Sequence, residues 1–550
     1  MDSDAYRPPP RWLTGFVLAI VAATYLPTVG LGFVWDDIPL VVQNQSTGDV
    51  GNLPRFFTMD LWATTPGQEG GTGYYRPLML TSLALERAIY GLWPAGHHLQ
   101  NVMWHVLGTA GLMALARPRL GAWGAVVVGL LFGLHPMQSE AVIWVAARND
   151  PMATALGIWG LERVAGEHAS RSQMVAAFVF TMLAALAKES VFLLPALLFV
   201  VDRSGGPRLG WRRYIPILGG LGLVACLRLA VGVDGAGLPG VHGVQLLIRE
   251  LHHLFGLLLT RAVVPWPLHN GASLEWLSSL PTWRWLTGWL ALGVVLLGVA
   301  HRFRSGDCRP LAGLAWFTLS LAPVVIPIAD KGLIGERYLY LSLGGMAWAL
   351  GAGAGRRRAA VAGLLALPAI AAVQMRMPEW RDDPALWRAA VEKHPTPHTW
   401  GGLGLVLLGD GRVAEAYGLF VRALDDDRPD ASICAPAVRA AARLGRAGLL
   451  AQTGTWAARR GCDDAEFRGE RGLGLVRAGE WEAARGVAAA PGPRSPAGVV
   501  LAAVLATREG DAVALASAHS DPSAPEDLDA RVADILGAHA QDKHPRGVAP

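Results

Sequence analysis

Apolar runs of roughly 18 to 20 residues, each long enough to cross a bilayer as a helix, recur along the first 375 residues of the chain. Short polar or arginine-containing stretches separate these runs. Near residue 378 the pattern changes to alanine-rich amphipathic stretches of ordinary charge density. The sequence therefore predicts an all-α protein, in which a polytopic membrane bundle (1–378) precedes a second helical region.

Arginine clusters in the short loops set the predicted topology, because positively charged loops face the cytoplasm. The segment 12–31 lacks the cleavage site of a secretory signal peptide and is expected to stay as a signal anchor. The segment 246–264 is charged and is expected to lie at the outer interface, although whether it crosses stays open. About eleven crossings follow, at 12–31, 98–116, 121–135, 151–165, 173–187, 190–202, 214–232, 284–301, 311–328, 337–354 and 359–375. The first outer loop (32–97) and the C-terminal region then lie outside.

Composition agrees with a membrane protein. Of the 550 residues, 52% are hydrophobic and 17% are charged, against about 25% charged in an ordinary soluble domain. This excludes a soluble single domain and a disordered chain. The net charge of +4 is spread over inter-helix loops, so nucleic acid is a poor partner. Four cysteines without a CxxC motif exclude a disulfide framework.

Under this topology, ionisable residues gather on the outer side, mostly at helix ends. A charge at membrane depth costs several kcal/mol unless it is paired or lines a watery cavity. Each residue alone can be a paired interfacial charge, and Lys188–Glu189 and Glu336–Arg337 can be neutral pairs. Together they predict one wet cavity, in which the cations suit a phosphate. The residues are Asp36, Asp37, Arg76, His135, Glu140, Arg148, Asp150, Lys188, Glu189, Glu336 and Arg337.

Two motifs allow several interpretations. Asp36 and Asp37, which open the first outer loop, can supply a catalytic base, bind a cation or cap a helix. His98, Asn101 and His105 share one face of a predicted crossing. They can be metal ligands or, more simply, hydrogen-bonded membrane side chains. We expect no cofactor, although Asp36, Asp37 and Glu140 could hold a divalent metal.

The C-terminal region has a period of 34 residues, marked by Gly411, Gly445 and Gly479. This period, with glycine at the turn between two helices, is typical of tetratricopeptide repeats. We expect repeats over 379–491, then partial capping helices and a polar tail over 492–550. In an oxidising compartment Cys434 and Cys462 can pair, although their spacing does not establish the geometry.

Several longer motifs occur in order, and they resemble a known family. They are FVWDDIPLVVQNQ, YYRPL, HLQNVMWH, LFGLHPMQSEAVIWVAARNDPMA, AKES and GERYLYLSLG, followed by the repeats. With these motifs the chain resembles the transmembrane and tetratricopeptide-repeat O-mannosyltransferases of the GT-C glycosyltransferase superfamily. The match runs over about 30–200 and 310–350.

The resemblance implies an inverting membrane enzyme that uses a polyprenyl-phosphate-linked sugar on the non-cytoplasmic face. It implies that Asp36 or Asp37 is the catalytic base and that Glu140 is a second acidic position. Arg337, with Arg148, Lys188 and Arg76, is then expected to bind the donor phosphate. The supporting residues are expected to be His135, His105, Asp150, Glu189 and Glu336.

The expected function is transfer of mannose or another hexose to an acceptor hydroxyl, such as protein Ser or Thr. The repeats are expected to bind an acceptor or partner protein on the same outer side. The composition is typical of bacteria and favours an inner-membrane location with a periplasmic site. Two alternatives remain: a lipid-linked glycan polymerase or ligase, and a non-enzymatic membrane scaffold. A transporter would need inverted repeats or broken helices, which the sequence does not display.

Overall fold

The structure is a computed structural model, which divides into two compact units at Leu386/Trp387. The sequence places this change near 378. The structure describes residues 9–10, 12–65, 73–166, 168–205, 208–233, 241–265, 268, 272–274, 277, 279–425, 433–445, 447–490 and 494–542. The polar tail after 542 lies outside these residues.

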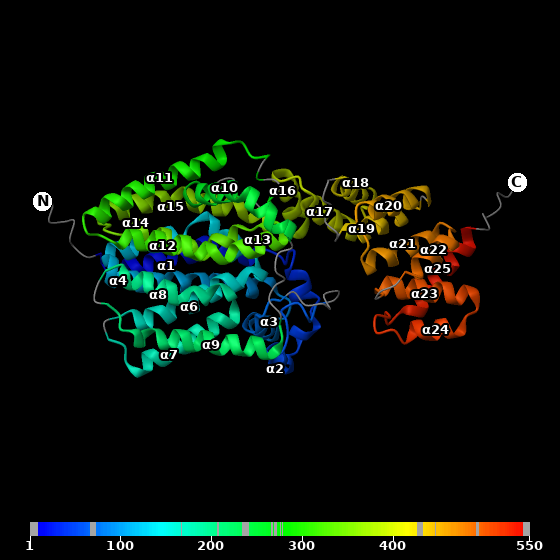
Figure 1. Cartoon of the computed structure of the whole chain (residues 1–550), viewed down its shortest axis with the longest axis horizontal. Helices are drawn as coiled ribbons and strands as arrows, with labels where there is room; N and C mark the ends of the chain where they lie inside the picture. Colours follow the sequence, from blue (N-terminus) through cyan, green and yellow to red (C-terminus); the bar gives the residue numbers. More distant parts are fainter. Residues whose placement is uncertain are drawn as a thin grey trace. The chain divides into compact units, whose positions relative to one another are not determined.

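The first unit is a bundle of helices that run side by side in Figure 1. Its longer helices are α1 (Trp12–Tyr25), α3 (Pro77–Tyr90), α4 (Pro94–Gly133), α6 (Asn149–Ala165), α7 (Arg171–Ala187), α8 (Leu194–Arg203), α9 (Tyr214–Val231), α10 (Val241–Val263), α11 (Trp283–Arg304), α12 (Arg309–Leu321), α14 (Tyr340–Gly351) and α15 (Arg356–Arg376). The shorter ones are α2 (Leu53–Phe56), α5 (Ser139–Ile143) and α13 (Val325–Lys331). One short antiparallel pair joins β1 (Ala272–Ser273) to β2 (Leu333–Ile334), so the predicted all-α class is confirmed.

Tight helical turns connect these helices, and several of them carry ionisable residues. They are η2 (Leu26–Gly30), η3 (Ile38–Val42), η4 (Gln45–Gly48), η5 (Val50–Asn52), η6 (Pro136–Gln138), η7 (Val145–Arg148), η8 (Glu189–Leu193), η9 (Trp211–Arg213), η11 (Ala322–Val324), η12 (Glu336–Leu339) and η13 (Met377–Trp380).

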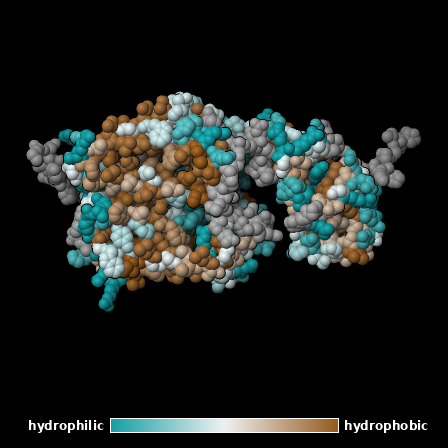
Figure 2. Space-filling model, viewed as in Figure 1, coloured by the Kyte–Doolittle hydropathy of each residue, from teal (hydrophilic) through white to brown (hydrophobic). Residues whose placement is uncertain are grey.

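Among the described residues, six helical segments are long and apolar enough to cross a membrane. They are Trp12–Gly30, Pro94–Gly133, Trp211–Val231, Trp283–Arg304, Arg309–Ala329 and Arg356–Trp380. Their outward faces are apolar: Leu297 on α11 and Leu364 on α15 are 74% and 67% exposed. Figure 2 shows hydrophobic side chains spread over this unit. The chain is therefore a multi-pass membrane protein.

The long helix α4 contains two of the expected crossings, 98–116 and 121–135. Gly121 has a non-helical backbone (φ 79°, ψ 172°) that interrupts the helix. A Cβ on Gly129 would meet Met113, and a Cβ on Gly133 would meet Thr109. These pairings require the chain to turn back at Gly121, so α4 is a pair of antiparallel helices. The two termini of α4, Pro94 and Gly133, therefore lie at the same end of the bundle.

The second unit is a series of helix pairs, preceded by α16 (Asp383–Lys393), which begins in the first unit. The helices are α17 (Pro397–Gly409), α18 (Val413–Leu424), α19 (Cys434–Arg443), α20 (Ala447–Arg459), α21 (Ala465–Arg477), α22 (Trp481–Ala488), α23 (Pro496–Glu509), α24 (Ala512–His519) and α25 (Leu528–Asp542). Gly411, Gly445 and Gly479 each have a positive φ at the turn between paired helices. The period of 34 therefore reflects a turn conformation that favours glycine.

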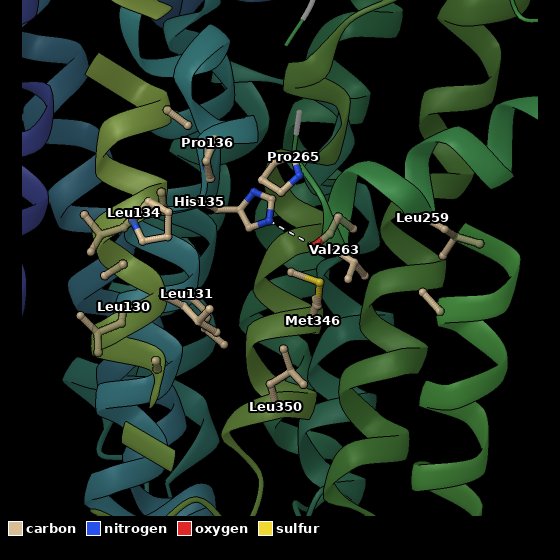
Figure 3. A pocket seen from close by; sticks show the side chains of 18 of the residues that line it. Leu130, Leu131, Leu134, His135, Pro136, Leu259, Val263, Pro265, Met346 and Leu350 are labelled. Carbon is tan, nitrogen blue, oxygen red and sulfur yellow. Dashed lines mark hydrogen bonds between the residues drawn. The ribbon is translucent and has the colours of Figure 1, made fainter. Parts of the chain in front are cut away.

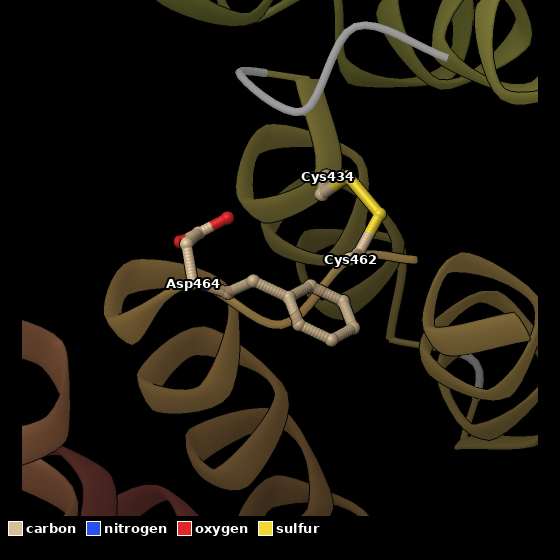
Figure 4. Close-up of a disulfide and its surroundings, with 4 residues drawn as sticks. Cys434, Cys462 and Asp464 are labelled. Carbon is tan, nitrogen blue, oxygen red and sulfur yellow. A yellow bond between two sulfur atoms is a disulfide. The ribbon is translucent and has the colours of Figure 1, made fainter. Parts of the chain in front are cut away.

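A disulfide joins Cys434 at the start of α19 to Cys462 after the end of α20, with Cα atoms 6.0 Å apart. Figure 4 shows this bond closing one helix pair, beside Asp464. The two cysteines that the sequence singled out are thus paired.

Candidate active site

A cavity of 510 Å³ in the first unit brings together six of the predicted site residues. Asp36 comes from the loop after α1, and Arg76 comes from the start of α3. Loops and helix starts contribute the other ionisable residues, Asp150, Lys188, Glu189 and Arg337. Trp62, Tyr74, Trp144 and Tyr338 supply aromatic walls, which sequence reasoning missed. A signal was available for two of them, because Tyr74 and Tyr338 lie within two residues of a charge in YYR and ERY.

The two adjacent acids of the first outer loop have different environments. Asp36 lines the cavity. Asp37 is fully buried, and its carboxylate accepts hydrogen bonds from the backbone N–H groups of Ala146 (2.7 Å) and Val34 (3.1 Å). Burial raises the pKa of Asp37 to about 8, although these two bonds act in the opposite direction. The position of Asp36 suits a base that acts on a bound molecule, whereas Asp37 fixes the loop.

Two ion pairs connect neighbouring elements at the cavity wall. Lys188 Nζ lies 2.6 Å from Asp150 Oδ1, and Arg76 Nε lies 3.0 Å from Glu189 Oε2. Burial raises the pKa of Glu189, but the charge and hydrogen bonds of Arg76 outweigh it and hold this pKa at about 2. Lys188 and Glu189, which are neighbours in the sequence, therefore pair with other residues.

The third cation, Arg337, forms an ion pair with Glu140. Burial lowers the pKa of Arg337, but the charges of Glu140, Tyr338 and Asp150 and the hydrogen bond to Glu140 together raise this pKa above its ordinary value. Glu140 also accepts hydrogen bonds from the backbone N–H groups of Glu336 (2.5 Å) and Arg337 (3.2 Å). The Arg337 guanidinium lies over the Trp144 ring, 4.9 Å from its centroid. Glu140 lies behind Arg337 and outside the cavity lining, so its contacts position Arg337.

Glu336 does not pair with its neighbour Arg337. It is buried and binds Arg261 (3.3 Å) and Arg376 (3.1 Å). This connects η12 to helices α10 and α15.

Arg148 was predicted to line this cavity but lies outside its lining, and so does His105, which was predicted as a supporting residue. Arg148 is fully buried and pairs with Glu86 on α3. His105 is buried between Tyr340 Oη (2.7 Å) and the Gly133 carbonyl (2.9 Å). Arg148 therefore joins elements of the bundle away from the cavity, and His105 joins the two halves of α4 to α14.

Each of the three polar residues predicted to share one helix face, His98, Asn101 and His105, binds a different partner. His98 Nε2 lies 3.2 Å from the Gly32 carbonyl, and Asn101 Nδ2 donates to the Trp144 carbonyl (2.8 Å). Within the part of the chain that the structure describes, no three His, Cys, Asp or Glu side chains are grouped as a metal site. The absence of a cofactor stays a prediction.

His135 lies in a second cavity of 740 Å³, lined mostly by apolar side chains of α4, α10, α11, α12, α14 and α15. Figure 3 shows the His135 ring extending into the space between these helices, with its hydrogen bond to the Ala262 carbonyl (3.1 Å). The neighbour of Ala262, Arg261, binds Glu336. This ion pair links α10, which borders the second cavity, to η12, which carries Arg337 at the first.

No protein-family model matches the sequence. Over 137 residues the chain is 35% identical to the protein O-mannosyl-transferase Tmtc2 of Drosophila melanogaster, covering 24% of this chain and 15% of that protein. It is 34% identical over 133 residues to Tmtc1 of the same organism (24% and 16%) and 28% identical over 138 residues to TMTC3 of Mus musculus (25% and 15%). The matches therefore span less than a fifth of each relative's length.

A solved structure is distantly similar. ArnT from Cupriavidus metallidurans, bound to undecaprenyl phosphate, aligns with a TM-score of 0.36 and 17% identity over 90% of this chain and 80% of that chain. The closer likeness is in the sequence. The predicted resemblance is confirmed: over 24% of its length, this multi-pass membrane chain is similar in sequence to the TMTC protein O-mannosyl-transferase Tmtc2.

Proposed function

We propose that the chain is a membrane glycosyltransferase, which moves mannose or another hexose from a polyprenyl-phosphate donor to an acceptor hydroxyl. The observation that carries the proposal is that Asp36 lines one cavity together with three cations, Arg76, Lys188 and Arg337. The other two carboxylates of this cavity, Glu189 and Asp150, are paired with Arg76 and Lys188. The homology to protein O-mannosyl-transferases supports hexose as the sugar and protein Ser or Thr as the acceptor.

The proposed chemistry needs two functions on opposite sides of the anomeric carbon. Asp36 takes the proton of the acceptor hydroxyl as that oxygen attacks the carbon. The bond to the phosphate oxygen breaks, and the cations stabilise the negative charge that develops on the leaving lipid phosphate. A single displacement of this kind inverts the anomeric carbon. Trp62 and Tyr74 offer flat apolar faces against which a sugar ring can pack.

The second cavity supports a lipid-linked donor. A space of 740 Å³ with largely apolar walls suits the prenyl chain of such a donor. Arg261, the neighbour of Ala262 in this space, pairs with Glu336, the residue before Arg337. The chain of the donor would therefore enter beside α10, while its phosphate reaches the cations.

The proposal includes a non-cytoplasmic site. The Cys434–Cys462 disulfide supports an oxidising compartment for the repeats. A repeat unit on the same side as Asp36 can raise the local concentration of an acceptor at the cavity.

Transfer can be tested with the full chain in lipid nanodiscs, polyprenyl-phosphate mannose and a peptide rich in Ser and Thr. We expect the peptide to gain the mass of one hexose, and Asp36→Asn to abolish this gain. Mass spectrometry of surface proteins from cells with and without the gene identifies the natural acceptor. Near-normal transfer by Asp36→Asn would contradict the mechanism, whereas no transfer by the wild-type chain would favour the scaffold alternative.

A further inference from the structure

The segment that leaves the last membrane helix returns to the loop that carries Asp36. Asp383 Oδ1 accepts a hydrogen bond from the backbone N–H of Trp35 (2.6 Å). Two residues earlier in the segment, the Arg381 carbonyl accepts one from the N–H of Gly32 (3.0 Å). The chain therefore joins residues 348 positions apart, immediately beside the proposed base.

Trp35 has an unusual backbone conformation. Its φ is +53°, and it is the one non-glycine residue with a positive φ in the described part of the chain. The left-handed region is unfavourable for a residue with a bulky side chain, so it persists only where the surroundings hold it. Asp383 binds the N–H of this same residue, and so it holds the backbone where the strain lies.

Aromatic packing holds the side chain of Trp35 as well. Its ring stacks on Trp144, with centroids 4.7 Å apart and an interplanar angle of 8°. Trp144 in turn packs against Trp380, with centroids 6.0 Å apart. The segment after α15 thus contacts the loop directly through two backbone N–H groups and indirectly through Trp144. Trp144 also carries Arg337 on its face, so the same contacts reach the cation.

The conformation of Trp35 decides which way the next two residues face. Asp37 is directed into the protein, where Ala146 and Val34 bind both of its oxygens. Asp36 is left facing the cavity. A change in the Trp35 backbone would rotate the following peptide and move the Asp36 carboxylate relative to the cations.

We infer that Asp383 is a positioning residue for Asp36: through its hydrogen bond to the Trp35 N–H it keeps the loop in the conformation that directs the proposed base into the cavity. This inference rests on the proposed function. It also assigns a role to the segment that leads into the repeat unit, since α16 begins at Asp383.

Two substitutions at this position separate the hydrogen bond from the charge. Asp383→Ala removes the acceptor, whereas Asp383→Asn keeps an oxygen that can accept from Trp35. Because small displacements of a catalytic group reduce turnover strongly, we expect Asp383→Ala to lower kcat roughly tenfold or more with little change in the KM for the donor. Asp383→Asn is expected to keep most of the wild-type kcat. Equal loss in both variants would overturn the inference.

Asp382 provides the matched control. Its Oδ1 accepts a hydrogen bond from the Ala385 N–H (2.8 Å) at the start of α16. Asp382→Ala therefore removes a cap from the same helix and leaves the hydrogen bond from Trp35 to Asp383 in place. We expect Asp382→Ala to keep near-normal kcat. If it lowers kcat as much as Asp383→Ala does, the start of α16 matters and the contact to Trp35 does not.

Amide hydrogen exchange tests the contact without relying on turnover. In the full chain, the peptide that contains Trp35 should exchange faster in Asp383→Ala than in wild type or Asp382→Ala. Unchanged exchange would overturn the inference even if transfer is observed. A wild-type chain that transfers no hexose would instead refute the proposed function. The exchange result would still show whether Asp383 holds the backbone of Trp35.

Discussion

Replacement of Arg337 tests whether this residue binds the donor phosphate or only neutralises Glu140. In Arg337→Ala the Glu140 side chain, 3% exposed, loses its cation. Removal of one partner from a buried pair costs about 3–5 kcal/mol. The phosphate would also lose a charge-assisted hydrogen bond of about 1.5–3 kcal/mol, which corresponds to a roughly 10- to 150-fold weaker affinity for the donor.

The double variant Glu140→Gln/Arg337→Gln separates these two effects. Its two amides can hydrogen-bond in place of the ion pair, so no unpaired charge is buried. We expect thermal stability near that of wild type. The KM for the lipid-linked sugar should stay at least about tenfold higher, because Gln cannot replace the charged guanidinium as a hydrogen-bond donor to the phosphate.

The assay is transfer at varied concentrations of polyprenyl-phosphate mannose, with thermal unfolding of the same samples. Arg148→Lys is the control, since Arg148 is as cationic as Arg337 but lies outside the cavity. It should lower stability without a selective effect on the donor. Full donor affinity in the double variant would refute phosphate binding by Arg337.

Four further outcomes are expected. Asp36→Asn should abolish transfer with normal expression and thermal stability, and a stable variant that still turns over would contradict its role as base. Burial raises the pKa of Asp37 to about 8 from its ordinary 3.8. The folded state therefore binds more protons than the unfolded state, so stability should fall as pH rises from about 4 to 8. Asp37→Asn should flatten this dependence in thermal unfolding. A chelator such as EDTA should leave transfer unchanged, since three cations are available for the phosphate; loss of activity with recovery on adding Mg²⁺ or Mn²⁺ would show a metal requirement. Alkaline phosphatase fused at the C-terminus should be active outside the cytoplasm, whereas fluorescence of a cytoplasm-dependent reporter there would place the repeats inside.

The sequence predicts some of the residues that meet, but not how they pair, and Asp37, His135, Glu140, Arg148 and Glu336 lie outside the lining of the predicted cavity. The loop charges sort the helix ends to two sides, and Asp36, Arg76, Asp150, Lys188, Glu189 and Arg337 do line one cavity. Hydrophobic length and loop charge together give the side of the membrane on which a residue lies, yet they contain no information about its neighbours across the bundle. Arg148 and Arg337 therefore look equivalent in the sequence, although one binds Glu86 in the interior.

Adjacent residues show the same limit at a finer scale. Nothing in the dipeptide distinguishes Asp36 from Asp37. The distinction comes from Trp35 and from the N–H of Ala146, which is 109 positions away from Asp37 in the sequence. Repeat period and turn glycines, in contrast, are local properties, and for that reason Gly411, Gly445 and Gly479 fall at the turns.

The pairing of the cavity cations has a consequence for product release. Arg76, Lys188 and Arg337 already have the carboxylates of Glu189, Asp150 and Glu140 as partners. Under the proposed function, transfer converts a phosphodiester into a lipid monophosphate, which carries more negative charge and would remain bound to unpaired cations. Here the carboxylates can return to the cations and compete with the product. Neutralising Glu189 as Gln should therefore slow release, so that added lipid monophosphate inhibits the variant at lower concentration than it inhibits wild type.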